Sequence, residues 1–358
     1  MRIAFYTPTL AMGGYEKVVL GYANEFVKKH QVTIICGKAE GPLANDIARE
    51  VKVVDFKCRM RGYLKKMTAW LKENTVDILY VPFTTFTLMT ILAKKWTRST
   101  CVIYGAQHGF EKRHVIIDRI IGRIVNKADV LTAVCNAVAD YEAERLFIER
   151  NRYYILDNPV IDSQKRIVPC EHKWLGGNKT YPVIIVSGRI AEDKRNDIAV
   201  RILAEIIKKK DVRMIVLGDG PEKNKVEQLS DKLGVRAKVD FSGYVQNPKG
   251  YMINADVFLH TARLEAFGNV IVEALHCNLP IVSTDCGGPI DIIEGDKYGI
   301  NIGAWNEEDV VERGAEAILK ILNREVRFEG MQKKAAKYDA KYLEEQFLEP
   351  YYECIKKN

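Results

Sequence analysis

The sequence predicts an α/β protein of two domains, each built on a doubly wound parallel sheet. Short apolar segments typical of strands alternate with amphipathic helical segments along the whole chain. This alternating set occurs twice, and a polar stretch with turn residues separates the two sets at about 160–180. The length of 358 residues fits two domains of ordinary size.

The element boundaries follow from the spacing of apolar residues. In the first half the expected strands are 2–7, 32–36, 51–54, 77–81, 101–105 and 129–134. In the second half they are 182–188, 212–217, 238–242, 256–260 and 280–284. Amphipathic stretches such as Glu16–Lys28 and Ile198–Lys208 lie between strands, and Leu343–Ile355 is a last helical pattern. We therefore expect domains at 1–165 and 166–340, followed by a helix at 341–358.

The composition excludes several classes of protein. Hydrophobic residues make up 47% and charged residues 28%, which is the balance of a globular chain rather than a disordered one. No apolar run approaches the ~20 residues that cross a bilayer, and the first residues read as a strand, not a signal peptide. The eight cysteines are scattered without a Cys-x-x-Cys pair, which indicates reduced thiols and argues against zinc. We expect a cytoplasmic protein.

The net charge of +7 is unevenly distributed along the chain. Residues 1–160 carry 24 basic and 16 acidic side chains, whereas residues 161–358 carry 30 and 31. A basic half beside a neutral half indicates that one half meets an anionic partner. Nucleic acid, an acidic lipid surface and a phosphorylated acceptor all satisfy this condition.

Glycines and cations follow several expected strands, where ligands bind in doubly wound sheets. Gly14 opens the first helix, where free N–H groups favour an anion, although a plain turn explains this Gly-Gly pair equally well. Gly188 and Arg189 end the strand 182–188, and Lys194 follows. Arg can grip a phosphate bidentately and Lys adds a point charge; a solvated basic loop is the alternative. Gly218 lies in a third loop of this kind, where a plain turn is as good an explanation.

The segment after strand 256–260 carries the strongest signal. Phe267-Gly268-Asn269 can start a helix whose first N–H groups receive phosphate. Glu265 lies in the loop before it, and Glu273 lies four residues after Asn269 on the same face. One acid could bind sugar hydroxyls and the other ribose hydroxyls, whereas a surface helix position is the alternative for Glu273. His108 follows strand 101–105 and is placed for a ligand, although a lone histidine is as often structural.

The absence of three motifs argues against particular classes of enzyme. The sequence has no Walker A motif, which argues against a P-loop nucleotidase. It has no Asp-x-Asp pair, which argues against a sugar transferase that holds its diphosphate through a metal. It also lacks the Gly-x-Ser-x-Gly nucleophile elbow.

Taken in order, these motifs resemble the retaining glycosyltransferases of family four, which have the GT-B fold. The resemblance covers residues 1 to about 300. The residues that carry it are Gly13-Gly14-Tyr15-Glu16, Ser187-Gly188-Arg189, Lys194, Gly218-Asp219-Gly220, Glu265, Glu273, Asp285 and Gly287-Gly288. It implies two facing Rossmann-like domains with a nucleotide-sugar in the cleft, and a C-terminal helix that crosses back to the N-terminal domain.

The resemblance also implies roles for single residues. Arg189 and Lys194 should hold the donor diphosphate, Glu265 the transferred sugar and Glu273 the ribose. His108 should contact the sugar and support its developing positive charge. The remaining donor-binding positions are Gly14, Gly188, Gly218, Phe267, Gly268 and Asn269. The chain departs from the family pattern at Gln107, Ala266 and Asp291, which bears on fine specificity.

The implied reaction moves a hexose or N-acetylhexosamine with retention of configuration, from a UDP-sugar or, as second choice, GDP-mannose. The departing nucleoside diphosphate leaves negative charge on a phosphate oxygen, which fixed cations and helix N–H groups stabilise. No metal or other cofactor is then expected. Two-step retention needs a carboxylate nucleophile, and the sequence names no convincing one. The resemblance implies attack from the same face, with the leaving phosphate taking the proton of the acceptor.

Residues 57–72 predict an acceptor-side or membrane surface. Basic residues interleave with apolar ones spaced by three and four, which is typical of a basic amphipathic helix. The basic residues include Arg59, Arg61, Lys65 and Lys66. They would face an anionic membrane, on its inner side, and a glycan or lipid-linked acceptor. An ordinary helix packed on the sheet is the alternative.

Two other functions stay open at this point. A nucleotide-sugar epimerase would share the fold but would not need an acceptor surface. A nucleic-acid-binding protein would use the basic half, but the sequence contains no recognisable RNA- or DNA-binding motif, so nucleic acid is not expected as a partner.

Overall fold

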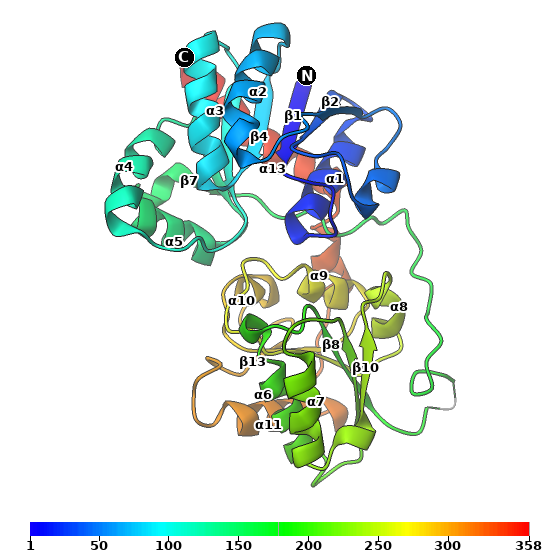
Figure 1. Ribbon diagram of the computed structural model, residues 1–358. Coiled ribbons are helices and arrows are strands. Elements are labelled where there is room, and N and C mark those ends of the chain that lie inside the picture. Colours follow the sequence, from blue (N-terminus) through cyan, green and yellow to red (C-terminus); the bar gives the residue numbers. More distant parts are fainter. Residues whose placement is uncertain (178, 358) are drawn as a thin grey trace. The chain divides into compact units, whose positions relative to one another are not determined.

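The computed structural model describes residues 1–177 and 179–357, which form two compact units (Figure 1). Unit 1 comprises Met1–Asp162 together with the chain from Tyr338 onward, and unit 2 comprises Ser163–Lys337. The sequence predicted these two boundaries between residues 165 and 166 and between residues 340 and 341.

Unit 1 is a parallel sheet of seven strands in the order β3-β2-β1-β4-β5-β6-β7. The strands are β1 Arg2–Thr7, β2 Gln31–Cys36, β3 Lys52–Asp55, β4 Ile78–Pro82, β5 Val102–Gln107, β6 Val130–Ala133 and β7 Tyr153–Ile155. Along β1, Ile3 and Phe5 belong to one buried cluster, and Ala4 and Tyr6 to another. Because successive side chains point to opposite faces, both faces of the sheet are covered, and this explains the unbroken apolar run.

The helices of unit 1 cover these two faces. They are α1 Gly14–Phe26, α2 Met60–Glu73, α3 Phe83–Thr97, α4 Val115–Val125, α5 Asn136–Leu146 and α13 Ala340–Lys357. Residues of α1 and α13 join the cluster of Phe5, whereas residues of α2 and α3 join the cluster of Tyr6. Within the described ranges, every helix is too short or too polar to cross a bilayer.

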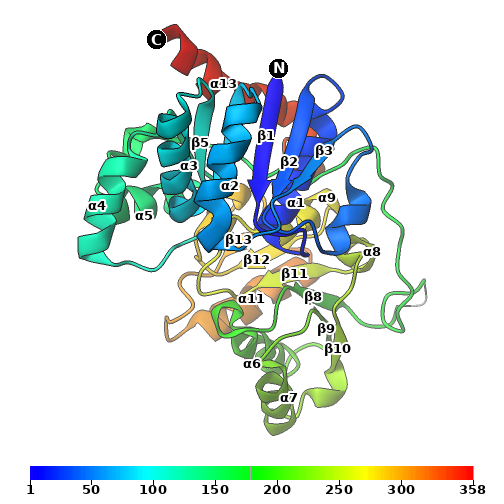
Figure 2. The same cartoon turned by 45° about the horizontal axis from the view of Figure 1, so that its top comes forward.

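Unit 2 is a parallel sheet of six strands in the order β10-β9-β8-β11-β12-β13 (Figure 2). Counted from β8, this is the order 3-2-1-4-5-6 of a Rossmann fold. Its strands are β8 Val183–Ser187, β9 Arg213–Leu217, β10 Val239–Gly243, β11 Val257–His260, β12 Ile281–Ser283 and β13 Ile300–Asn301. Its helices are α6 Asn196–Ile206, α7 Lys223–Lys232, α8 Pro248–Met252, α9 Asn269–His276, α10 Gly288–Ile293, α11 Val310–Leu322 and α12 Met331–Ala336.

The predicted fold class is confirmed, and the sequence pattern missed two strands. These are β7 and β13, which have three and two residues and pair with a single neighbour each. A strand this short contains too few alternating positions to produce a signal in the sequence. Tertiary pairing at the edge of the sheet defines both.

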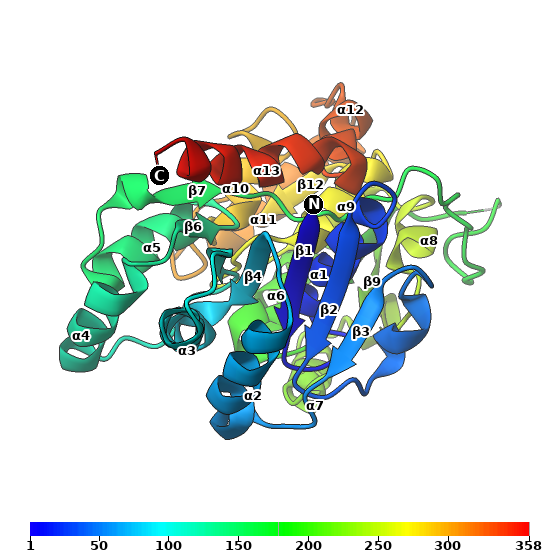
Figure 3. The same ribbon diagram turned by 90° about the horizontal axis from the view of Figure 1, so that it is seen from above.

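The last helix packs on unit 1, as the sequence predicted (Figure 3). Phe347 of α13 is fully buried. Its ring centroid lies 5.2 Å from that of Tyr22, 5.0 Å from that of Phe26 and 5.3 Å from that of Tyr104. The Tyr104 hydroxyl also donates a hydrogen bond of 2.9 Å to the Phe347 carbonyl. A single aromatic side chain therefore joins the end of the chain to the first sheet.

The variant Phe347→Ala should lower the free energy of unfolding by about 3–5 kcal/mol, because it leaves a cavity among these aromatic rings. Tyr352→Ala, on an exposed side of the same helix, is the matched control and should change it by less than about 0.5 kcal/mol. Urea unfolding measures both. Equal effects of the two variants would show that α13 is no part of the core.

Candidate functional site

Each sheet reverses its strand order at one place, and candidate residues gather at both places. In unit 1 the chain passes from β1 outward on one side to β3 and then returns to β4; in unit 2 it passes from β8 to β10 and returns to β11. Ligands of such sheets bind beyond the carboxyl ends of the strands at this switch point. Both units carry polar side chains there.

In unit 2 a small pocket opens beyond β8 and β11. It is lined by Val186, Ser187, Gly188, Arg189, Lys194, Asn196, His260 and Thr261. Three predicted donor-binding residues, Gly188, Arg189 and Lys194, thus line one pocket. Arg189 is exposed and Lys194 is half-buried, so a ligand can reach both cations.

Hydrogen bonds fix the turn that carries Lys194. The Thr261 hydroxyl donates to the carbonyls of Lys194 and Arg195, at 3.2 and 3.0 Å. The guanidinium of Arg195 makes two hydrogen bonds to Asp197, of 2.9 and 2.8 Å, and stacks over Trp305. Arg195 is therefore a structural residue of the basic loop, and Lys194 is the cation that this turn presents to the pocket.

Lys194 forms an ion pair with Glu265 across this site. Its Nζ lies 2.7 Å from Glu265 Oε2, and both side chains are about one-fifth exposed. Burial disfavours the charged form of both groups, but the opposite charge of the partner outweighs this effect. The pKa of Lys194 is therefore raised and the pKa of Glu265 is lowered. Both groups are therefore charged at neutral pH. The two residues that the sequence assigned to diphosphate and sugar are in direct contact.

Three buried polar residues of the pocket, Asn196, His260 and Thr261, were missed by sequence reasoning. Asn196 and His260 are each 5% exposed, and Asn196 Oδ1 and His260 Nε2 have no hydrogen-bond partner among the described residues. Buried polar atoms of this kind are uncommon and costly unless a ligand or water pairs with them. Their positions gave the only signal, since His260 ends an expected strand and Asn196 follows the basic loop.

Backbone contacts hold the predicted glycine and acidic loops against this pocket. A Cβ atom on Gly218, whose φ is +147°, would lie 1.9 Å from the Gly188 carbonyl oxygen, so only glycine fits there. The N–H of Glu265 donates to the Cys286 carbonyl at 2.7 Å, and the N–H of Gly288 donates to the Glu265 carbonyl at 2.9 Å. The loop of Glu265 is thus tied to the loop after β12.

The remaining predicted donor residues of unit 2 lie in and just before α9. Gly268, with φ of +91°, caps the helix, Asn269 is its first residue, and Phe267 before them is buried. Glu273 is half-buried in the second turn and is not among the residues that line the small pocket. The structure therefore joins Glu265 to Lys194, and positions Glu273 one helical turn along α9.

In unit 1, His108 lies just beyond the end of β5 in an aromatic setting. Its Nε2 is 2.6 Å from the Tyr80 hydroxyl, and its ring meets that of Tyr15 edge-on at 4.7 Å. Burial lowers the pKa of His108 to about 3, so the imidazole is neutral at physiological pH. Tyr80 is a further residue that the sequence did not single out, and Tyr15 was named there only as part of the first glycine motif.

The predicted anion site at the start of α1 already holds a carboxylate of the chain. Gly13 caps this helix and Gly14 is its first residue. The side chain of Glu16 folds back over them, and a Cβ atom on Gly13 would lie 2.0 Å from Glu16 Oε2. Burial raises the pKa of Glu16. An incoming anion would have to compete with this side chain for the first N–H groups of the helix.

Comparisons with known proteins agree with this arrangement. Residues 12–164 match the family model described as Glycosyltransferase Family 4, and residues 171–341 match the one described as Glycosyl transferases group 1. Together the two segments cover about nine-tenths of the chain.

The chain is a family 4 glycosyltransferase.

Two curated relatives are similar to this glycosyltransferase in sequence. The phosphatidylinositol N-acetylglucosaminyltransferase gpi3 subunit of Schizosaccharomyces pombe is 21% identical over 64% of this chain. A Campylobacter jejuni N-acetyl-D-galactosaminyltransferase, whose name specifies a glycan on diphospho-undecaprenol, is 24% identical over 97% of this chain. The chain spans about half the length of the fission yeast protein, and 97% of the Campylobacter protein.

A solved structure shows the same fold. The Anabaena protein HepE, in complex with UDP-glucose, matches with a TM-score of 0.73 and 19% identity, over 100% of this chain and 99% of that one. The two Rossmann-like units of this glycosyltransferase, together with such neighbours, show the GT-B fold.

The predicted membrane surface of the glycosyltransferase has only one side in solvent. Helix α2 buries its apolar residues Tyr63, Met67 and Leu71 in the core of unit 1. The basic residues Arg59, Arg61, Lys65 and Lys66 are exposed. These buried residues are unavailable to a bilayer because they pack in the core, whereas Met60 at the start of α2 is 54% exposed.

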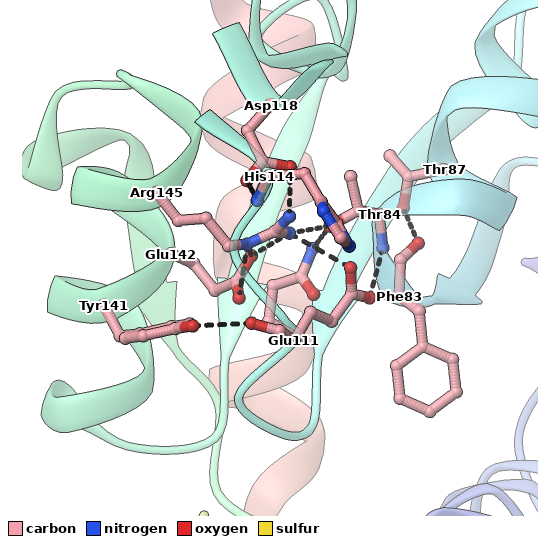
Figure 4. A network of polar contacts seen from close by, with 10 residues as sticks. Phe83, Thr84, Thr87, Glu111, His114, Asp118, Tyr141, Glu142 and Arg145 are labelled. Carbon is pink, nitrogen blue, oxygen red and sulfur yellow. Dashed lines mark hydrogen bonds and ion pairs between the residues drawn. The ribbon is translucent and has the colours of Figure 1, made fainter. Parts of the chain in front are cut away.

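A buried ionic network organises the chain that follows His108 (Figure 4). Arg145 of α5, 3% exposed, lies 2.8 Å from Asp118 of α4, 2.6 Å from Glu142 and 3.0 Å from Glu111. Glu111 in turn accepts a hydrogen bond of 3.0 Å from the N–H of Thr84 at the start of α3. One guanidinium thus joins three helices to the loop beyond His108. No local pattern in the sequence predicts this network.

The glycosyltransferase should lose stability as the pH falls from 7 to 5. Burial lowers the pKa of His108 to about 3 and that of His260 to about 4. In the unfolded chain both titrate near 6.5, so between these values the unfolded state binds the protons and acid favours unfolding. Each histidine should contribute about 2 kcal/mol to the loss between pH 7 and 5.

Denaturant unfolding of His108→Gln and His260→Gln at both pH values measures this loss. Each variant should lose less stability between pH 7 and 5 than the wild type. His114→Gln, at an exposed position, is the control for histidine replacement. If both buried-site variants keep the full wild-type difference, neither histidine is held neutral by burial.

Proposed function

We propose that this glycosyltransferase transfers a hexose or N-acetylhexosamine from a UDP-sugar to a glycan or lipid-linked acceptor, with retention of configuration and without a metal ion. GDP-mannose is the second donor choice. The observation that carries the proposal is the pocket at the switch point of unit 2. There Arg189 and Lys194 lie beside buried polar atoms of Asn196 and His260 that have no hydrogen-bond partner among the described residues.

The two cations suit a diphosphate. Arg189 is exposed and forms no ion pair within the described residues, so its guanidinium can take two phosphate oxygens. The ammonium of Lys194 has three N–H donors, and Glu265 engages it at 2.7 Å. A phosphate oxygen can therefore bind Lys194 while the pair with Glu265 persists. These fixed charges would stabilise the leaving diphosphate in place of a metal.

The acidic partner suits the sugar. Glu265 is held charged by Lys194, so its oxygens accept hydrogen bonds from hydroxyl groups. The ion pair would thus couple recognition of the diphosphate to recognition of the transferred sugar. Glu273, one turn into α9, is proposed to bind the ribose.

Retention by same-face attack is the mechanism we propose. It needs a phosphate oxygen that takes the acceptor proton, and it needs no enzyme nucleophile. His108 is proposed to contact the sugar. Its imidazole is neutral at pH 7 because burial lowers its pKa to about 3, and a neutral ring can support positive charge on the sugar where a protonated one would oppose it.

The relatives support the choice of substrates. The HepE structure contains UDP-glucose, and the two curated relatives are named for transfer of N-acetylglucosamine or N-acetylgalactosamine. The Campylobacter protein is named for an acceptor on diphospho-undecaprenol. A lipid-linked acceptor at an anionic membrane agrees with the basic, exposed side of α2, which we propose as the acceptor-side surface.

Removal of either cation should impair transfer. We expect Arg189→Ala and Lys194→Ala to lower kcat/KM by about 100-fold or more, because each removes charge from the leaving diphosphate. Lys208→Ala, at an exposed ion pair with Glu205, is the control and should leave it unchanged. The assay follows donor consumption and acceptor glycosylation. Near wild-type rates in both pocket variants would refute the proposed donor site.

A nucleotide that binds this pocket should raise the melting temperature. At 100 times its Kd, UDP should stabilise the fold by about 2.7 kcal/mol. A thermal-shift panel of UDP, GDP and their sugars identifies the base, and Arg189→Ala should abolish the shift.

Transfer should also persist in EDTA; an absolute requirement for a divalent ion would contradict the metal-free mechanism.

A further inference from the structure

Helix α4 packs into unit 1 with its small side and turns its large aliphatic side to solvent. The buried residues are Asp118, Gly122 and Val125, three to four positions apart. Ile116, Ile117 and Ile120 are 80%, 57% and 59% exposed. A surface helix of a globular protein has the opposite arrangement, with its aliphatic stripe in the core. Exposed residues in such a contiguous group mark an interaction surface.

The orientation of α4 is fixed by its buried side. A Cβ atom on Gly122 would lie 1.8 Å from the Leu146 carbonyl oxygen, so the helix approaches the end of α5 closely. Asp118 is held by Arg145 at 2.8 Å, and it accepts a hydrogen bond from the N–H of His114 at 2.6 Å (Figure 4). Turning the isoleucines inward would expose this ion pair and bring bulky side chains against Leu146.

The exposed charges around these isoleucines are all positive from Lys112 to Lys127, a stretch that the structure describes in full. They are Lys112, Arg113, Arg119, Arg123 and Lys127. The one acidic side chain of the stretch, Asp118, is buried against Arg145. Arg113 contacts the exposed Glu144 of α5 at 2.8 Å. Arg119 stacks on Phe147, which is 53% exposed and extends the apolar surface.

We propose that α4 and Phe147 dock on the interface of an anionic lipid bilayer, with the helix in the membrane plane. An apolar face bordered by Lys and Arg is the pattern of helices that bind such interfaces. Aliphatic side chains enter the acyl boundary, and the flanking cations meet anionic headgroups. Figures 1 and 3 show α4 at one end of unit 1, beside α3 and α5.

The charges disfavour a second copy of the chain as the occupant. A symmetric dimer through α4 would bring the same positive surface of both copies together. Such like-charge contacts are destabilising. The bilayer inference deepens the proposed function, on which it rests for the lipid-linked acceptor. It assigns the main apolar contact to α4, since the exposed large apolar residue of α2 is Met60.

Vesicle pelleting tests the inference with the full chain, without donor or acceptor. The wild type should bind phosphatidylcholine vesicles that contain phosphatidylglycerol and bind weakly to phosphatidylcholine alone. The double variant Ile116→Ser/Ile120→Ser should bind at least about tenfold more weakly. Arg119→Ser/Arg123→Ser should lose at least about tenfold on anionic vesicles only. Val168→Ser, at an exposed apolar position of unit 2, is the matched control and should bind like the wild type.

Two further measurements separate this inference from the donor site. Both α4 variants should keep wild-type transfer to a soluble acceptor analogue, whereas Arg189→Ala should lose transfer and still bind vesicles. Wild-type binding of vesicles by both α4 variants would overturn the inference. So would an isoleucine variant that is monomeric in gel filtration where the wild type is a dimer, since α4 would then be an interface between copies.

Discussion

The ion pair between Lys194 and Glu265 is the contact on which the candidate donor site depends. It joins the loop after β8 to the loop after β11, and it keeps both groups charged although they are largely buried. Without Glu265, burial would lower the pKa of Lys194 and weaken the positive charge that a diphosphate requires. Without Lys194, the carboxylate would lose its main stabilising charge. Each residue thus keeps the other in the charged form that the proposed chemistry requires.

The sheet of unit 2 brings these loops together. β8 and β11 are neighbours although some 70 residues separate them along the chain, so their carboxyl ends open at one point. The hydrogen bonds from Thr261 to the turn of Lys194, and from Glu265 to the loop after β12, keep the side chains in place before any ligand binds. Such fixed polar groups need little reorganisation during a reaction.

Unit 1 uses a second buried ionic contact for another purpose. Arg145 balances three carboxylates and links α3, α4 and α5 to the loop beyond His108. This network orders that loop, and it also holds α4 with its aliphatic side facing outward. The same network that orders the chain next to a proposed catalytic histidine therefore also fixes the proposed membrane contact. Removing one member would leave buried charges unpaired, which is costly.

The sequence by itself determined the fold class, the two sets of strands and the loops that carry Gly188, Arg189, Lys194 and Glu265. These follow from local periodicity and from the rule that ligands bind beyond strand ends. Tertiary structure decided the rest. The pairing of Lys194 with Glu265, the buried polar atoms of Asn196 and His260, the Arg145 network and the direction in which α4 faces all join residues from separate elements. Local pattern predicts that a helix is amphipathic, but only packing decides which of its sides is buried. In α2 the side with large apolar residues is buried, whereas in α4 that side faces solvent.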